Sequence, residues 1–285
     1  MASISGNERP DLRDLLAFYA AAGVDDALVD DPIDRFAESA QRQAAPAQQP
    51  LQAGEREAPR LGADRPAPPP PRPAAIAAVP DEAQAAAARE LASKAASLDE
   101  LKQIMADFDG CNLKATAKSM VFADGNPEAD LMLVGEAPGR DEDLEGLPFV
   151  GRSGQLLDLI LAAIGLDRKS AYIANVIPWR PPGNRTPTPH ETEICRPFVE
   201  RQIALAKPKV LVTLGGPSAK LLVGSQEGIL RLRGSWKSHV TADGTVIPVM
   251  PTLHPAYLLR NPAHKKLAWR DFLEVKAKLR ELGSH

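Results

Sequence analysis

Short apolar runs alternate with longer amphipathic segments along the chain from about residue 130 onward. Asp130-Leu-Met-Leu-Val-Gly135 is an apolar run that ends in a loop, which is typical of a strand buried on both faces. Similar apolar runs, each read as a strand, recur at residues 171–176, 210–214 and 246–250. Segments that read as helices lie at residues 153–164, 191–205, 218–222 and 263–282. Strands that alternate with helices predict an α/β fold, in three α/β/α layers around a central, mostly parallel four-stranded sheet.

The first part of the chain has a different pattern. Residues 11–36 place apolar side chains on a loose helical period, which predicts a short helix outside the main domain. Ten prolines lie between residues 46 and 80, and a stretch of that kind cannot bury enough apolar surface to become ordered. We therefore expect an extension over 1–36, a disordered Pro/Ala-rich linker over 37–80 and one folded domain over 81–285.

Two features near this boundary refine the picture. Ser97-Leu-Asp-Glu100 has the spacing of a capping box and predicts a helix that runs to about Phe108. For the helix within 11–36, docking on the domain and binding to a partner protein are both open, with a slight preference for the partner.

Composition narrows the class of protein. The net charge is −3, but residues 1–90 are acidic and the last 86 residues carry 14 bases against 6 acids. A basic end suits a nucleic-acid partner, although solvated helix faces explain such an imbalance about as well. The two cysteines, Cys111 and Cys195, exclude a disulfide-stapled scaffold and suit a reducing compartment. With no signal peptide and no apolar run long enough to span a membrane, we expect a soluble cytoplasmic protein.

Residues that could bind a ligand or take part in a reaction follow the predicted strands. Gly135 and Glu136 come after the first strand, Asn175 ends the second, Gly215-Gly216 follow the third, and His254 follows the fourth. In parallel sheets ligands bind beyond the carboxyl ends of the strands. Four strand ends with polar or glycine-rich loops therefore predict a binding site at that edge.

Each candidate also has a structural interpretation. Phe149 lies in a loop, where an aromatic ring either stacks on a base or plugs the loop onto the core. Asn175 offers a donor and an acceptor to a pyrimidine edge, or forms a turn before Pro178. His254 lies in a proline-punctuated loop, which favours a site over a core histidine. The segment from Gly216 to Ser218 opens a helix whose free N–H groups suit a phosphate.

Four long motifs carry a resemblance to a known family: GEAPGRDED at 135–143, LPFVGRSGQLLD at 147–158, NVIPWRPPGNRTPTPHE at 175–191 and LHPAYLLRNP at 253–262. Together they make residues 108–280 resemble the family 4 uracil-DNA glycosylases, while residues 1–90 lie outside the resemblance. No dinucleotide-binding or nucleoside-triphosphate loop is present in the sequence. The resemblance implies a protein that flips uracil out of DNA and hydrolyses its N-glycosidic bond.

The resemblance also implies roles for the base pocket. Phe149 would stack on the extruded uracil, and Asn175 would hydrogen-bond its edge. Glu142 would crowd the C5 position and help to exclude thymine. Gly135 and Ala137 complete the substrate-binding set that we expect.

For chemistry and DNA binding the implied roles fall on other residues. His254 would stabilise the departing uracil anion, and Glu136 would position or activate the attacking water. Leu258, four residues after the histidine, would wedge into the gap left by the flipped nucleotide. Independently of the resemblance, the basic side chain of Arg260 and the helix start at Gly216 and Ser218 are expected to contact DNA phosphates.

The chain departs from the family at its metal cluster. Family 4 enzymes usually hold an iron–sulfur cluster on four cysteines, and here only Cys111 and Cys195 match, whereas Lys114 and Trp179 occupy the other two positions. Lysine and tryptophan cannot replace thiolates in such a cluster. We therefore expect no cofactor and no bound metal, with Trp179 filling part of the space.

The sequence is compatible with more than one function. We expect a monomeric hydrolase that acts on single- or double-stranded uracil-containing DNA, with no membrane partner. The alternatives are a protein that binds damaged or uracil-bearing DNA with weak or covalent single-turnover activity, and a glycosylase for another deaminated base. Covalent trapping by a histidine is the less favoured outcome, because His190 follows a proline rather than the basic insertion of the subgroup that links to DNA.

Overall fold

The computed structural model describes residues 81–283, and the predictions made for residues 1–80 lie outside the described residues. Six strands form one sheet, in the order β1-β3-β2-β4-β6-β5. The strands are Ala123–Gly125 (β1), Leu131–Gly135 (β2), Tyr172–Asn175 (β3), Val210–Leu214 (β4), Lys237–Val240 (β5) and Val246–Thr252 (β6).

The four central strands are those that the sequence pattern predicted. β3, β2, β4 and β6 pair in parallel, with Leu133 opposite Ile173 on one side and Val212 on the other. All residues of β2 and β4 are buried, as expected for parallel strands that are covered on both faces.

The predicted four-stranded sheet is incomplete, because β1 and β5 extend it at the edges as antiparallel strands. β1 has only three residues, one of them glycine, and β5 is largely exposed. Neither segment has an apolar run, so the sequence pattern contains no strand signal for them.

Nine α-helices lie within the described residues: Asp81–Lys94 (α3), Leu98–Asp107 (α4), Arg140–Glu145 (α5), Arg152–Ile164 (α6), Pro189–Ala206 (α7), Gly216–Val223 (α8), Ile229–Leu232 (α9), Pro255–Arg260 (α10) and Lys265–Glu281 (α11). Ser97 caps α4 as predicted, since its side chain accepts a hydrogen bond from the Glu100 N–H. The structure differs from the prediction at α10, which begins directly after His254, where the sequence pattern predicts a loop.

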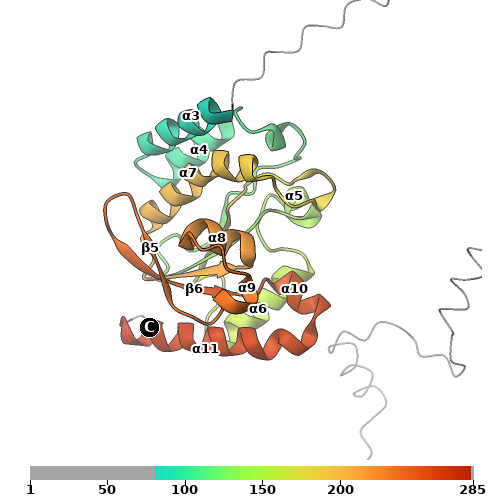
Figure 1. The fold of residues 1–285 in the computed structure, drawn as a ribbon, viewed down its shortest axis with the longest axis vertical. Helices are drawn as coiled ribbons and strands as arrows, with labels where there is room; N and C mark the ends of the chain where they lie inside the picture. Colours follow the sequence, from blue (N-terminus) through green and yellow to red (C-terminus); the bar gives the residue numbers. More distant parts are fainter. Residues whose placement is uncertain (1–80, 284–285) are drawn as a thin grey trace, which may run out of the picture. The chain divides into compact units, whose positions relative to one another are not determined.

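Helices cover both faces of the sheet, so the predicted three layers are confirmed (Figure 1). On one face α3, α4 and α7 pack over Met132 and Val134 of β2. On the other face α6 and α11 pack over Leu131 and Leu133 of the same strand. Alternate residues of one strand thus belong to two separate cores, which fixes the register of the strand in the sheet.

No helix in the described part of the chain combines the length and the apolar character that crossing a bilayer requires.

Candidate active site

A cavity of about 380 Å³ opens at the carboxyl ends of the parallel strands. Its lining includes seven of the predicted site residues: Glu136, Ala137, Glu142, Phe149, Asn175, His254 and Arg260. They come from five separate parts of the chain, which only the fold brings together. A larger cavity of about 570 Å³ lies at the opposite edge, near Leu131 and Lys276, and contains none of the predicted residues.

Gly135 lies directly behind this cavity and cannot be replaced by a larger residue without movement. A Cβ atom there would lie 2.4 Å from Asn175 Oδ1 and 2.7 Å from Phe149 Cζ. The glycine therefore lets two predicted base-contacting side chains approach the end of β2, a close packing that any side chain would prevent.

Asn175 ends β3 with its amide in a protected position. The side chain is 6% exposed, and its Oδ1 has no hydrogen-bond partner among the described residues. Since a buried acceptor without a partner is costly, this atom points to a ligand that would complete it.

Phe149 and His254 form one wall of the cavity as a stacked pair. Their ring centroids are 5.5 Å apart, and the ring planes differ by 27°. Phe149 adopts a positive φ of 55°, a conformation that is uncommon for a residue other than glycine and that has to be held by its surroundings.

His254 is both the N-cap of α10 and a part of the site. Its Nδ1 accepts a hydrogen bond of 3.1 Å from the Ala256 N–H. Burial, with a smaller contribution from the charge of Arg260, lowers the pKa of His254 to about 4. At neutral pH the ring is thus uncharged, and because Nδ1 is an acceptor, the proton lies on Nε2.

Glu136 follows β2 and lines the same cavity. Its backbone carbonyl accepts a hydrogen bond of 3.0 Å from the Ile177 N–H, which ties the loop to the segment after β3. Burial raises the pKa of the Glu136 carboxyl group. Since water solvates a buried carboxylate poorly, a positive charge that forms nearby stabilises its ionised form.

Glu142 lines the cavity, but both of its carboxylate oxygens have backbone partners. Oε2 accepts a hydrogen bond of 3.1 Å from the Gly139 N–H, and Oε1 accepts one of 3.2 Å from the Gly151 N–H. The side chain therefore joins two loops of the site, in addition to any contact with a base.

Two predicted DNA contacts do not reach the surface. Leu258 is 1% exposed and packs with Leu253 and Ala268, so in this structure its side chain is buried, and the role as a wedge in DNA stays a prediction. Leu258 is buried because this segment forms the helix α10 in place of the predicted loop, and Leu258 lies on the inner face of that helix. Ser218 is fully buried, and its hydroxyl donates to the Gly215 carbonyl, which leaves no hydroxyl for a phosphate. Gly216 is the first residue of α8 and lies outside the cavity lining.

Some lining residues were not among the predicted ones. Arg185, Thr186 and Tyr257 line the cavity, and the Arg185 guanidinium forms two hydrogen bonds, of 2.8 and 2.6 Å, with the Glu191 carboxylate. The Thr188-to-Glu191 spacing of a capping box was the available signal, because it places the start of α7 beside this loop.

The residues at the four cluster positions do not fit an iron–sulfur cluster. The Cys111 and Cys195 sulfur atoms are 4.0 Å apart and buried. The Lys114 ammonium group donates to the Ala106 carbonyl and the Asp109 carboxylate, both at 2.6 Å. Trp179 is 2% exposed and belongs to the core. Two thiols and an indole packed in this way offer too few ligands for a cluster that needs four.

Comparison with known proteins gives a consistent result. A family model described as the uracil DNA glycosylase superfamily matches residues 122–273. The chain is 40% identical over 186 residues to a type-4 uracil-DNA glycosylase of Sulfurisphaera tokodaii. The aligned part covers 63% of this chain and 84% of the relative.

Two further relatives carry the same name. The enzyme of Archaeoglobus fulgidus is 39% identical over 183 residues, covering 63% of this chain and 92% of the relative. That of Thermotoga maritima is 35% identical over 192 residues, covering 65% and 98%. The chain therefore belongs to the uracil-DNA glycosylase superfamily, where it groups with the type-4 enzymes.

Proposed function

We propose that this protein removes uracil from DNA by hydrolysing the bond between the base and the deoxyribose, which leaves an abasic site. The observation that carries the proposal is the convergence of Glu136, Phe149, Asn175 and His254 on one cavity. Family membership and the names of the type-4 relatives support it. An extruded uracil base fits a pocket with one stacking wall and a few polar groups.

The pocket side chains suit the uracil ring. Phe149 supplies an aromatic face beside the base, and the unpartnered Oδ1 of Asn175 is an acceptor for the ring N3–H. Gly135 and Ala137 keep the backbone close to the ring, with no side chain larger than a methyl group. Glu142 is held by two backbone N–H groups, and in this proposal it would face C5 of the base and exclude the methyl group of thymine.

The reaction needs a stabilised leaving group and a shielded sugar cation. As the bond between C1′ and N1 breaks, its electron pair moves into the uracil ring, and the neutral His254 donates its Nε2 hydrogen towards O2. The Glu136 carboxylate orients a water molecule towards C1′ and accepts its proton after attack. A carboxylate near a developing cation also stabilises it by charge.

We further propose that the enzyme works without a cofactor or metal. The support is the chemistry at positions 111, 114, 179 and 195, where an ammonium group and an indole ring replace two thiols. Packing of Trp179 and its neighbours would then hold the segment after β3 in place of a cluster.

The DNA partner contacts the same edge of the sheet in this proposal. Arg260 is exposed at the end of α10 and lines the cavity, where it can hold a phosphate. We propose a cytoplasmic location, because two free buried cysteines suit a reducing compartment. We also propose that the protein acts as a monomer. A protein partner for residues 1–36 is proposed only from the sequence pattern.

The test is excision from oligonucleotides that carry one uracil, as single strands and as duplexes, followed by alkali to cleave abasic sites. We expect cleavage by the wild type and a loss of roughly 100- to 1000-fold in kcat for Glu136→Gln and for His254→Ala. Glu227→Gln, an exposed carboxylate outside the cavity lining, is the matched control and should match the wild type.

The same oligonucleotides, in three further measurements, separate the alternatives. Retention of intact uracil strands in a gel shift, with no cleavage, would favour a binding protein. A covalent adduct that persists in denaturing gels and disappears in His190→Ala would favour single-turnover trapping. A panel of strands with hypoxanthine or mismatched thymine shows whether another base is preferred.

A further inference from the structure

The backbone of Phe149 is held in a conformation that its own sequence does not favour. Its φ of 55° is one of three positive values at non-glycine residues within the described part of the chain. A phenylalanine there is strained, and it relaxes to a negative φ unless contacts prevent this.

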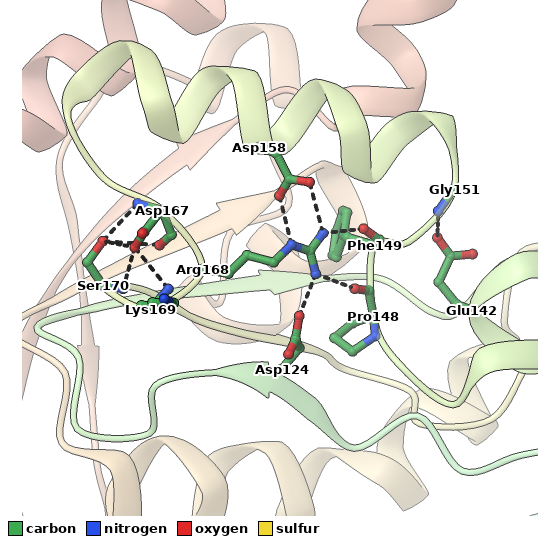
Figure 2. Close-up of polar contacts among 10 residues, drawn as sticks. All are labelled: Asp124, Glu142, Pro148, Phe149, Gly151, Asp158, Asp167, Arg168, Lys169 and Ser170. Carbon is green, nitrogen blue, oxygen red and sulfur yellow. Dashed lines mark hydrogen bonds and ion pairs between the residues drawn. The ribbon is translucent and has the colours of Figure 1, made fainter.

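Arg168 contacts the backbone of this loop directly (Figure 2). It lies in the turn between α6 and β3, and it is not among the residues that line the cavity. Its guanidinium donates one hydrogen bond to the Phe149 carbonyl and another, of 3.2 Å, to the Pro148 carbonyl. Both carbonyls thus point towards one planar group.

Two carboxylates fix the orientation of that guanidinium. Nη1 donates to Asp124 of β1 at 2.6 Å, and Nε donates to Asp158 of α6 at 2.8 Å, with a longer contact of 3.5 Å from Nη2 to the same carboxylate. An arginine has five guanidinium N–H groups, and these contacts use all of them. Lysine carries a single ammonium group and could not reproduce this planar set.

The turn that carries Arg168 is itself built by side-chain hydrogen bonds. The Asp167 carboxylate accepts hydrogen bonds from the Lys169 and Ser170 N–H groups, at 2.9 and 3.0 Å, and from the Ser170 hydroxyl at 2.8 Å (Figure 2). This arrangement fixes the start of the arginine side chain, and the guanidinium is fixed at the other end.

On its other side the loop meets Glu142 and α6. The Gly151 N–H donates to the Glu142 carboxylate at 3.2 Å (Figure 2). A Cβ atom at Gly154 would lie 1.6 Å from the Phe149 carbonyl oxygen, so the loop packs closely on the first turn of the helix. Among the hydrogen bonds of the described residues, Arg168 is the charged side chain that donates to the Phe149 carbonyl.

We propose that Arg168 is a positioning residue for uracil excision, which holds Phe149 in its positive-φ conformation and so places the aromatic wall of the base pocket. The inference rests on the proposed role of Phe149 in stacking on the base. Arg168 touches neither base nor sugar and acts through the backbone of 148–149.

Arg168→Ala is the main variant, and Arg201→Ala is its matched control. Arg201 also donates from Nε and Nη2 to a backbone carbonyl, that of Ala95, but it joins α7 to the end of α3 away from the cavity. We expect Arg168→Ala to lower kcat/KM roughly 10- to 100-fold, mainly by raising KM, since a stacking wall contributes to binding the base. Arg168→Lys should lie between the wild type and alanine. Arg201→Ala should stay within about twofold of the wild type even if it unfolds at a lower temperature.

A double-mutant cycle with Phe149→Ala distinguishes positioning from a general loss of structure. Phe149→Ala alone should lower kcat/KM roughly 5- to 150-fold, the range expected for one lost stacking contact. Adding Arg168→Ala to it should then cost little more. Fully additive losses, or an unchanged kcat/KM in Arg168→Ala, would overturn the proposal.

Amide hydrogen exchange tests the same idea without activity. Arg168→Ala should raise exchange across 148–152 while β2 and β4 stay protected, and Arg201→Ala should leave 148–152 unchanged. Unchanged exchange at 148–152 in Arg168→Ala would refute the positioning role. If the wild type fails to excise uracil, the proposed function fails by itself, whereas the exchange result still shows whether Arg168 holds the loop.

Discussion

The rings of Phe149 and His254 stack with centroids 5.5 Å apart, although the residues are separated by 105 positions in the chain. One ring comes from a loop with a positive φ, and the other caps a helix. The aromatic wall of the pocket and the proton donor of the proposed reaction are thus parts of one packed unit. A change that moves either ring is expected to disturb both binding and catalysis.

Activity should fall on the acid side at a higher pH than for an ordinary glutamate. Burial raises the pKa of Glu136 above the ordinary glutamate value of 4.5, and the proposed mechanism uses the ionised form. As pH falls through this raised pKa, the carboxylate takes up a proton and kcat/KM declines. The pH profile of kcat/KM measures this. The residual rate of Glu136→Gln should lack the decline, and an identical decline in that variant would exclude Glu136 as its source.

Stability should fall between about pH 6.5 and pH 4 because of His254. Its pKa is about 4 in the folded protein against 6.5 for an ordinary histidine, so in this window the unfolded chain binds a proton that the folded chain does not. The contribution of His254 to stability is therefore fully present above pH 6.5, and roughly 3 kcal/mol of it is lost by pH 4, below which the loss levels off. Denaturant unfolding at several pH values measures the slope. His254→Gln, which has no ring to protonate, should show a shallower slope over this window, and an equal slope would contradict the assignment.

Gly154→Ala should damage the enzyme where Gly228→Ala does not. At Gly154 the added methyl group meets the Phe149 carbonyl, a backbone atom that cannot move cheaply, whereas at Gly228 it meets nothing within 4 Å. We expect a loss of about 1–3 kcal/mol in stability and a marked fall in kcat/KM, because the loop that carries Phe149 must shift. Thermal unfolding and excision kinetics check both. Wild-type kinetics in Gly154→Ala would show that the loop can move without consequence.

Removing the charge of Arg260 should weaken binding of every sequence alike and make it less sensitive to salt. For Arg260→Gln we expect the slope of log affinity against log salt to fall by about one. Lys276→Gln, which lies by the cavity at the opposite edge of the sheet, is the matched control and should keep the wild-type slope. The pKa of His254 should also rise in Arg260→Gln, since the arginine charge contributes to its depression. An unchanged slope would place Arg260 outside the DNA interface.

The purified protein should contain no stoichiometric iron and show no visible chromophore. Cys111→Ala and Cys195→Ala should both retain excision, with a stability loss of about 1–2 kcal/mol, because each thiol then serves only as a small buried apolar group. Metal analysis and an absorption spectrum measure the first point, and kinetics of the two variants measure the second. A brown protein with stoichiometric iron would overturn the proposal of a cofactor-free enzyme.

The local pattern of apolar residues was sufficient to predict the four central strands, but it did not predict the elements whose local signal is weak. The runs in β2 and β4 are apolar because both faces are covered, and that requirement shows in any single run. β1 and β5 pair at the edges, where one face stays open and few apolar residues are needed. The sequence pattern does not predict α10, because its first residue is Pro255, a residue typical of loops that is nevertheless well tolerated in the first turn of a helix.

The sequence by itself determined the α/β class, the motifs at the strand ends and the identity of the residues that could bind a ligand or react. Apolar runs and reactive side chains can be recognised within a short segment of sequence, without knowledge of the fold. Only the tertiary structure decided which of them meet. It brought Glu136, Phe149, Asn175 and His254 to one cavity and turned Leu258 and Ser218 inward. It also showed that Arg168, which no motif marked, contacts the loop of Phe149. Such contacts depend on how distant segments pack, and no local pattern of side chains encodes that packing.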